Sequence, residues 1–368
     1  MGSSDGWIAS SVFGRGRVVW DAAGFQFLAV SLTSGIVLAE FPDLQVSKFS
    51  CRFEEMTSET VTLPWRNIPS NWYEATVPYG TAILLTRGST VLWGGIVVKR
   101  ERVLQGSGLS LTLATVEHYL DSVYVKDHVY SNRDQCEIVK DLVSSTLKDH
   151  RFILSVEASP SSIRRDRTYE ESSDKTLLSV LQELSNVQNG PEWCTSWRNV
   201  DGRYVPVLTV ADRIGSTVPV TTFDESVMTA FRVLEDYTAG YGANMVWAVG
   251  DTTGEDQLRS DTMVAEQSYR PVVEHVVRPS SSIVRKETLN GYASSALQQL
   301  RDGTNTVGMT LSLMAAPIVY EEWRPGDVVA WTVADDDGRF TGFDRGEARV
   351  VGYDIDFSGV WTITPVLQ

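Results

Sequence analysis

The sequence predicts a mainly β protein in which an α+β part lies between two strand-rich regions. Three observations support this fold class. Short apolar–polar alternations separated by turn residues fill residues 24–115 and return after Pro219, and such alternation is typical of half-buried strands. Two apolar stripes at helical spacing lie between these regions, and a third interrupts the second region.

The first strand-rich region, residues 24–125, follows an N-terminal arm of residues 1–23. Its strands include FQFLAVSL, GIVLAEF and LQVSKFSCRFEE. The segment TAILLTRGSTVLWGGIVVKRERV predicts two strands joined by a hairpin turn at Arg87-Gly88-Ser89. About six short strands with regular turns indicate a small β-barrel or sandwich.

The middle region, residues 126–215, changes to mixed α and β patterns. DQCEIVKDLVSSTL predicts a helix that Asn132 or Asp134 can cap. SSDKTLLSVLQELSNVQNG predicts a second helix, with Gly190 as the residue that follows its C-terminal end. Asp201-Gly202 marks the turn of a later hairpin. We therefore expect a peripheral α+β domain here.

The second strand-rich region comprises residues 216–265 and 306–368. Its strands include TAFRVLEDYT, NMVWAVG and ARVVGYDIDF, with a strong turn at Pro325-Gly326. Between its two parts, residues 266–305 form an inserted peripheral segment. The segment contains the helix ETLNGYASSALQQLR, in which Leu289, Tyr292, Ala293, Ala296, Leu297 and Leu300 share one stripe.

Composition excludes several classes of protein. The formal net charge of −15 disfavours a nucleic-acid grip, which needs clustered Lys and Arg. No apolar run approaches the 18 residues of a membrane span, and the N-terminus lacks the order of a signal peptide. The odd count of three cysteines, with no CxxC, argues against a disulfide framework. We expect all three to be buried thiols: Cys51, Cys136 and Cys194.

The segment LTLATVEHYLDSVYV, residues 111–125, gathers the groups that general acid–base chemistry uses. A simpler interpretation is a strand that runs into a helix. Val116, Tyr119, Leu120 and Val123 would then form the apolar stripe, and we expect Glu117, His118 and Asp121 on the solvent face.

Other candidate motifs are weak. The histidines have no HExxH or HxH spacing, so no cofactor or metal is predicted. The DDDGRF segment does not match a calcium-binding loop. When Gly338 is placed at the sixth position of such a loop, the first position is Val333, whose side chain cannot bind calcium, and the twelfth is Asp344 in place of the usual Glu. We interpret it as an acidic hairpin tip. The adjacent carboxylates, such as Glu54-Glu55, do not point to a glycosidase pair across a cleft. The tryptophans Trp247, Trp331 and Trp361 are expected in the core or an interface.

The order of elements resembles the tail hub proteins of phages with long non-contractile tails that infect Actinobacteria, a group related to the hubs of contractile tails and to type VI secretion spikes. The resemblance covers most of the chain. It rests on four segments, which are VLWGGIVVKRERV followed by GLSLTLATVEHYLDSVYV, DQCEIVKDLVSSTL, DKTLLSVLQELSNVQNGPEWCTSW, and VEHVVRPSSSIVRKETLNGYASSALQQLR with the later EEWRPGDVVAWTV.

This resemblance implies two small β-barrels that form a tube-like ring domain, with α+β parts outside it. It implies a structural, non-enzymatic homotrimer at the virion tail tip, synthesised in the host cytoplasm. Two barrels from each of three chains would continue a hexameric tube and join it to three-fold tip proteins. The implied partners are the tail tube protein, the distal-tail ring, the tape measure protein and the central tip or fibre proteins.

A negative lumen would let DNA pass without specific binding. Some hubs carry a C-terminal peptidase or lysin region, and because this chain ends directly after the strand VWTITPVL, no enzymatic domain is expected. As interface residues we name the charged residues of the acidic tip: Asp335, Asp336, Asp337 and Arg339.

Two other functions stay open at this point. One is a distal-tail or receptor-binding module with a carbohydrate-facing barrel, which clustered exposed tryptophans in a shallow groove would favour. The other is a cell-wall hydrolase, which two convergent carboxylates in a deep pocket, one with a raised pKa, would favour.

Overall fold

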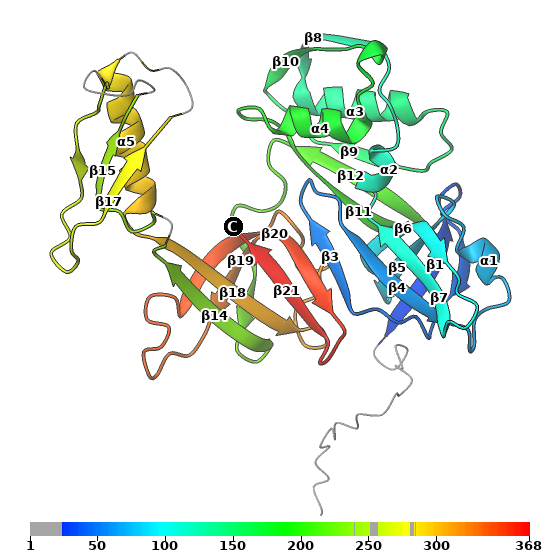
Figure 1. Cartoon of the computed structure of the whole chain (residues 1–368). Helices are drawn as coiled ribbons and strands as arrows, with labels where there is room; N and C mark the ends of the chain where they lie inside the picture. Colours follow the sequence, from blue (N-terminus) through cyan, green and yellow to red (C-terminus); the bar gives the residue numbers. More distant parts are fainter. Residues whose placement is uncertain (1–23, 239, 251–256, 280–282, 284) are drawn as a thin grey trace, which may run out of the picture. The chain divides into compact units, whose positions relative to one another are not determined.

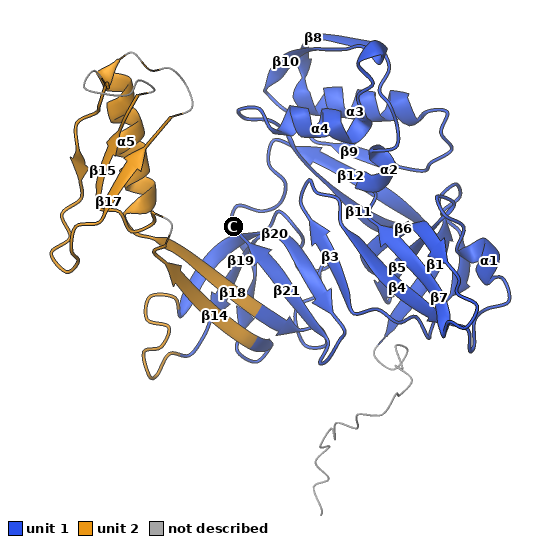
Figure 2. Cartoon of the chain, viewed as in Figure 1, with its two compact units in different colours: residues 1–229, 310–334, 344–368 blue, residues 230–309, 335–343 orange. Residues whose placement is uncertain are grey.

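The computed structural model describes residues 24–238, 240–250, 257–279, 283 and 285–368, and Figure 1 shows its helices and strands. The predicted N-terminal arm lies outside the described residues. The chain divides into two compact units (Figure 2). Unit 1 comprises Met1–Thr229, Thr310–Ala334 and Asp344–Gln368, and unit 2 comprises Ala230–Met309 and Asp335–Phe343.

The first sheet of unit 1 has six antiparallel strands in the order β2-β1-β5-β6-β7-β4. Its elements are β1 (Phe25–Ser31), β2 (Val37–Glu40), β4 (Ser58–Pro64), β5 (Thr81–Arg87), β6 (Thr90–Glu101) and β7 (Gly108–Ala114), with the short helix α1 (Trp72–Ala75) between β4 and β5. The hairpin predicted at Arg87-Gly88-Ser89 is confirmed, and Gly88 has the positive φ of 60° that such a tight turn favours. An isolated bridge from Gln45 to Thr62 links the segment after β2 to edge strand β4.

Strand β3 (Lys48–Arg52) leaves the sheet of its sequence neighbours. It pairs with β20 (Arg345–Asp356), so that Phe49 lies opposite Ile355. Phe49 is fully buried, and its ring stacks on Trp93 of β6 at a centroid distance of 4.1 Å. Strand β3 therefore joins the first sheet to the second through backbone pairing on one side and aromatic packing on the other.

The α+β region of unit 1 contains a two-stranded sheet, β10-β8, and a three-stranded sheet, β11-β12-β9. Its elements are α2 (Glu117–Leu120), β8 (His128–Asp134), α3 (Gln135–Leu147), β9 (Ser155–Ala158), β10 (Arg164–Tyr169), η2 (Glu171–Ser173), α4 (Leu177–Ser185), β11 (Glu192–Val200) and β12 (Arg203–Ala211). The predicted hairpin at Asp201-Gly202 is confirmed as the turn between β11 and β12.

Both predicted helices of this region form, but the second is shorter than expected. Asp134 caps α3 by accepting hydrogen bonds from the amides of Cys136 and Glu137. Helix α4 starts after Thr176 and ends at Asn186, so the prediction that Gly190 follows its end is wrong. The physical reason is local: Asn186 still donates its amide to the Gln182 carbonyl, but its ψ of 0° departs from the helical value of about −42°, so the backbone leaves the helix there without a glycine.

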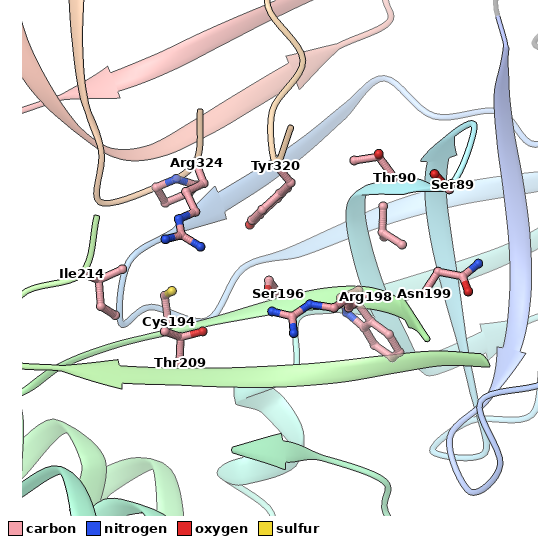
Figure 3. Close-up of a pocket in the computed structure, with 13 residues that line it drawn as sticks. Ser89, Thr90, Cys194, Ser196, Arg198, Asn199, Thr209, Ile214, Tyr320 and Arg324 are labelled. Carbon is pink, nitrogen blue, oxygen red and sulfur yellow. The ribbon is translucent and has the colours of Figure 1, made fainter. Parts of the chain in front are cut away.

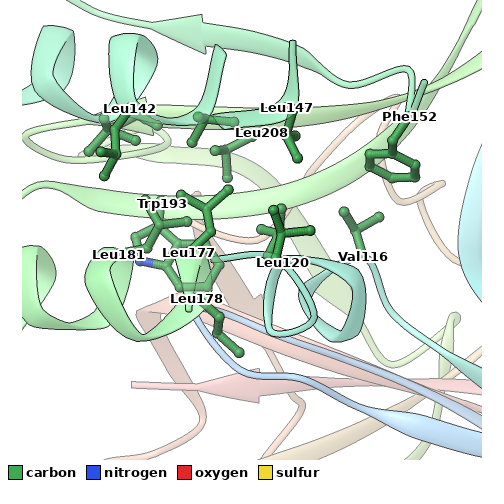
Figure 4. Packing of buried hydrophobic residues seen from close by; sticks show 14 of the residues in the cluster. Val116, Leu120, Leu142, Leu147, Phe152, Leu177, Leu178, Leu181, Trp193 and Leu208 are labelled. Atoms are coloured by element: carbon green, nitrogen blue, oxygen red, sulfur yellow. The ribbon is translucent and has the colours of Figure 1, made fainter. Parts of the chain in front are cut away.

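A single hydrophobic cluster joins these helices to the first sheet. Leu142 and Leu147 of α3, Leu177 and Leu181 of α4, and Trp193 of β11 pack together (Figure 4). The same cluster includes residues of the first sheet: Leu28, Val30, Ala82, Leu84, Val91 and Ile96. Because burial of a large aliphatic side chain stabilises by about 1.5–3 kcal/mol, this shared core holds the α+β region against the sheet.

The second sheet has the order β13-β19-β20-β21-β18-β14, with β3 attached to β20. Its elements are β13 (Pro219–Asp224), β14 (Met228–Asp236), β18 (Thr304–Ser312), β19 (Val328–Thr332), β20 and β21 (Thr362–Leu367). Strands β14 and β18 run from unit 1 into unit 2. The prediction of a mainly β protein is confirmed, and one of its sheets is curled as a half-barrel. Two closed barrels stay a prediction.

Unit 2 contains a small three-stranded sheet in the order β16-β15-β17 and one helix against it. These elements are β15 (Met245–Ala248), β16 (Met263–Val264), β17 (Glu274–Val277) and α5 (Lys286–Leu300). Leu289 and Ala293 of the predicted apolar stripe are buried, whereas Tyr292 is exposed. Within the described part of the chain, no helix has the length and apolarity needed to span a membrane.

Candidate functional site

The cluster of polar residues between Leu111 and Val125 does not lie on one solvent face. Asp121 is exposed, as expected, and accepts a hydrogen bond from Thr176 Oγ1 at 2.9 Å. His118 is half-buried, with Nε2 2.8 Å from the Tyr79 hydroxyl. Glu117 is 2% exposed, so its expected solvent position is wrong. Helix α2 has a single turn, which is too short for a helical periodicity to assign faces.

The Glu117 carboxyl lies between α2 and strand β11. Its Oε1 accepts a hydrogen bond from Thr195 Oγ1 at 2.6 Å, while its Oε2 is buried with no hydrogen-bond partner among the described residues. Burial removes the carboxyl from water and raises its pKa. A carboxyl in this position favours its neutral form, and its charge is costly to the folded state.

A pocket of about 380 Å³ lies in unit 1 against strands β11 and β12 (Figure 3). Its walls come from the β5–β6 turn, from β11 and β12, and from the segment before β19. The lining side chains include Thr90, Cys194, Ser196, Arg198, Tyr320 and Arg324. Figure 3 shows Tyr320 and Arg324 on one wall and Cys194 and Ser196 on the opposite wall.

The groups that line this pocket are poorly suited to nucleophilic chemistry. Burial raises the pKa of the Cys194 thiol, so the thiol stays protonated at pH 7 and is a poor nucleophile. Arg198 is already engaged by Glu157, with Nη1 to Oε1 at 2.6 Å. Arg324 is exposed at the rim. The pocket offers hydroxyl and guanidinium donors but brings no histidine or carboxylate beside the thiol.

A smaller cavity of about 20 Å³ lies behind the pocket, between Gly94 of β6 and Thr195 of β11. The buried Trp197, whose indole Nε1 has no partner among the described residues, also lines it. Cys51, Tyr320 and Tyr353 complete its wall, and burial raises the pKa of the Cys51 thiol to about 11. The volume is about that of one water molecule, but most of the lining is apolar.

A second pocket, of about 510 Å³, brings together two carboxylates that sequence analysis did not pair. Glu54 follows β3 with a left-handed φ of 57°, and its Oε1 accepts the amide of Trp193 at 3.2 Å. Burial raises the pKa of Glu54. Glu192 begins β11 and lines the same pocket.

Arg349 of β20 binds the Glu192 carboxylate with both guanidinium nitrogens, at 2.7 Å from Nη1 to Oε1. Glu192 also accepts the amide of Ile214 at 2.7 Å. This bidentate pair, which is mostly shielded from water, connects the α+β region to the second sheet. No local signal in the sequence pairs residues that lie 157 positions apart.

The predicted interface residues lie in the loop between β19 and β20. The Asp335 carboxylate accepts the amide of Phe340 at 2.7 Å, which shapes the turn. Asp336 and Asp337 are exposed, and Asp337 forms an ion pair with Arg339 at 2.7 Å. The hairpin-tip interpretation is confirmed, since β19 and β20 are antiparallel neighbours. Among the residues that the structure describes, no group of three or more His, Cys, Asp or Glu side chains could hold a metal ion.

The cysteines and tryptophans divide between core and partly exposed positions. Cys136 is buried, whereas Cys51 and Cys194 are partly exposed as residues, although burial of their thiol groups still raises both pKa values. Both line cavities rather than the packed core. Trp331 is buried as expected, and Trp247 and Trp361 are half-buried in strand positions or beside them.

Comparison with solved structures identifies proteins of the same fold. The 43 kDa tail protein of prophage MuSo2 from Shewanella oneidensis aligns with a TM-score of 0.53 at 12% identity, covering 94% of this chain and 98% of that one. The tail protein from Neisseria meningitidis MC58 aligns with a TM-score of 0.50 at 14% identity, covering 94% and 97%. No protein-family model and no curated protein matches the chain. The similarity therefore establishes the fold.

Proposed function

We propose that the chain is a structural hub protein of a phage tail tip, which assembles as a homotrimer. The observation that carries the proposal is its fold likeness to two tail proteins over 94% of its length and nearly all of theirs. A likeness that spans every region, rather than one sheet, supports a shared architecture. In this account the chain works by holding its sheets rigidly in place and not by catalysis.

The arrangement of unit 1 supports a role as a wall. The first sheet, with strands β1, β2 and β4 to β7, and the second sheet, with strands β13, β14 and β18 to β21, would each supply one barrel-like segment. The bridge between Gln45 and Thr62 supports closure of the first. Strand β3 pairs with β20 and packs on β6, which would lock two segments of one chain together. Three such chains would present six segments to a hexameric tube.

The partners and the channel follow from this proposal. The hub would contact the tail tube protein, the distal-tail ring, the tape measure protein and the central tip or fibre proteins. The net charge of −15 would keep DNA from adhering to the lumen. The loop with Asp335, Asp336, Asp337 and Arg339 would form part of a contact with one of these partners, because its acidic side chains are exposed.

Imaging of the purified protein tests the proposal directly. Native mass measurement should give three times the chain mass of 40.8 kDa. Class averages from electron microscopy should show a three-fold ring with a central hole. A solid particle without a hole would argue against a channel-lining role even if its mass were that of a trimer.

A second candidate function, cell-wall hydrolysis, is favoured by the pocket that Glu54 and Glu192 share. Glycosidases use two carboxyls across a cleft, one with a raised pKa, and burial raises the pKa of Glu54. The geometry weighs against this role, because Arg349 and the Ile214 amide already occupy the Glu192 carboxylate. A carboxylate held in this way is a poor nucleophile or base.

An assay on purified cell wall separates the two functions. The hub account predicts that wild type and the Glu54→Gln variant release equally little soluble sugar, at the level of a buffer blank. Glu55→Gln is the matched control, because Glu55 is exposed and does not line the pocket. Release by wild type and by the control, but not by Glu54→Gln, would establish the hydrolase instead.

A further inference from the structure

A partly exposed cluster of aromatic rings and guanidinium groups lies at one end of the first sheet. It is formed by the segment from the end of β4 through α1 and by the hairpin between β6 and β7. Trp65 and Trp72 meet edge to face, with ring centroids 5.5 Å apart, and Tyr73 adjoins Trp72 in the same way. The aromatic–arginine patch is defined by Trp65, Trp72, Tyr73, Arg100, Arg102, Val103 and Leu104.

The two arginines cover the aromatic rings of this patch. Arg100 Cζ lies 4.2 Å from the Tyr73 ring centroid and 5.8 Å from that of Trp72. Arg102 lies 5.8 Å from the Tyr73 centroid and 6.0 Å from the Trp72 centroid. Sugar-binding sites need a free aromatic face, whereas here guanidinium groups lie over the rings. The arrangement instead resembles the Trp, Tyr and Arg clusters that dominate protein–protein binding energy.

The tip of the β6–β7 hairpin extends the patch with apolar side chains in full contact with water. Leu104 is 100% exposed and Val103 is 61% exposed, while Tyr73 is 49% exposed. The fully accessible Leu104 and the mostly exposed Val103, which follow Arg102 in the hairpin, add an apolar area that association would shield from water.

The charge of the patch is opposite to that of the chain. Neither Arg100 nor Arg102 lies within ion-pair distance of a carboxylate among the described residues, whereas the nearby Lys99 is paired with Glu101 at 3.3 Å. Glu74 of α1 is the other local carboxylate. The chain as a whole carries 47 acidic against 32 basic side chains. The patch is therefore cationic on a strongly acidic protein.

We infer that the aromatic–arginine patch docks onto an acidic face of a second copy of this chain, in a head-to-tail contact. The inference rests on the proposed trimer and assigns one of its two contacting surfaces. A cyclic trimer joins two different surfaces at each interface, whereas a two-fold dimer joins a surface to itself. Two copies of a cationic patch repel each other across a two-fold axis, whereas one copy of it is attracted to a neighbouring chain whose net charge is −15.

Sedimentation analysis of the full chain and three variants tests this inference. Arg102→Glu and Leu104→Asp change exposed groups of the patch, and Arg203→Glu is the matched control at an exposed site at the start of β12. We expect Arg102→Glu and Leu104→Asp each to weaken trimer formation by about tenfold or more, since like charges across an interface are strongly unfavourable. Arg203→Glu should assemble as wild type does. Thermal melts should show that all four proteins are folded.

The outcomes separate the inference from the proposed function. A wild-type trimer that persists in both patch variants would overturn the inference and leave the hub proposal standing. A wild type that stays monomeric would overturn both. If Arg203→Glu weakened trimer formation as much as the patch variants do, the effect would be one of overall charge, and the assignment of the subunit contact to the patch would be overturned. Binding of a cell-wall oligosaccharide that the patch variants lose, with assembly unchanged, would assign the patch to a sugar instead.

Discussion

At the scale of single residues, Glu117 is a buried carboxyl through which folding depends on pH. Its Oε1 is held by Thr195 and its Oε2 has no hydrogen-bond partner among the described residues. Because the folded state raises its pKa above the ordinary 4.5, the folded chain keeps this proton at pH values where the unfolded chain has lost it. This contribution to stability is present below pH 4.5 and is lost as the pH rises through the folded-state pKa.

Substitution of Glu117 by Gln should therefore stabilise the protein at alkaline pH and have little effect in acid. We expect the free energy of unfolding at pH 8 to rise by about 1 kcal/mol or more, the scale of an uncompensated buried polar group. Denaturant titrations between pH 4 and pH 8 measure it. Glu171→Gln, at an exposed site, is the control and should follow wild type. Parallel pH profiles for wild type and Glu117→Gln would show that Glu117 does not carry this pH dependence.

Both Asp121 and Glu117 were predicted to face solvent, and the prediction is confirmed for Asp121 and wrong for Glu117. A periodicity assigns faces only where an element is long enough to repeat, and α2 has four residues. The Asp134 cap was predictable because a cap acts through its immediate neighbours. The pairing of Glu54 with Glu192 in one pocket, and of Glu192 with Arg349, depends on tertiary structure and leaves no local pattern.

At the scale of elements, local patterns predicted hairpins and helices but not strand partners. The β5–β6 and β11–β12 turns and helices α3 and α5 follow from residues close in sequence. Strand β3 has the same alternation as its neighbours, yet it pairs with β20 about 300 positions away. Alternation identifies a strand and its buried face, whereas the partner is decided by the whole fold.

The ion pair between β20 and β11 gives a test at this scale. Arg349→Ala leaves the Glu192 carboxylate largely shielded and without its cation, so we expect a loss of about 2–4 kcal/mol in the free energy of unfolding. Arg345→Ala on the same strand is the control, because its pair with Asp344 is exposed and should contribute less than about 1 kcal/mol. Equal effects in chemical denaturation would contradict a specific role for the Arg349–Glu192 pair.

At the scale of the whole molecule, the sequence predicted a mainly β chain with an α+β part in the middle, and the likeness to tail proteins supports that architecture. The sequence predicted an inserted segment of residues 266–305, whereas unit 2 begins at Ala230 and also contains the strand of NMVWAVG, β15, which pairs with β16 and β17 and not with the second sheet. The boundary left no local signal, because β14 and β18 continue through it without a linker composition. Local sequence patterns also carry no information on oligomeric symmetry, because a trimer depends on surfaces that meet only in the assembly.

The most direct test of the hub account is electron microscopy of the purified chain, with its native mass measured on the same sample. The account predicts a particle of three times 40.8 kDa, with three-fold symmetry and an open central channel. A monomer at every protein concentration, or a closed two-fold dimer, would contradict it.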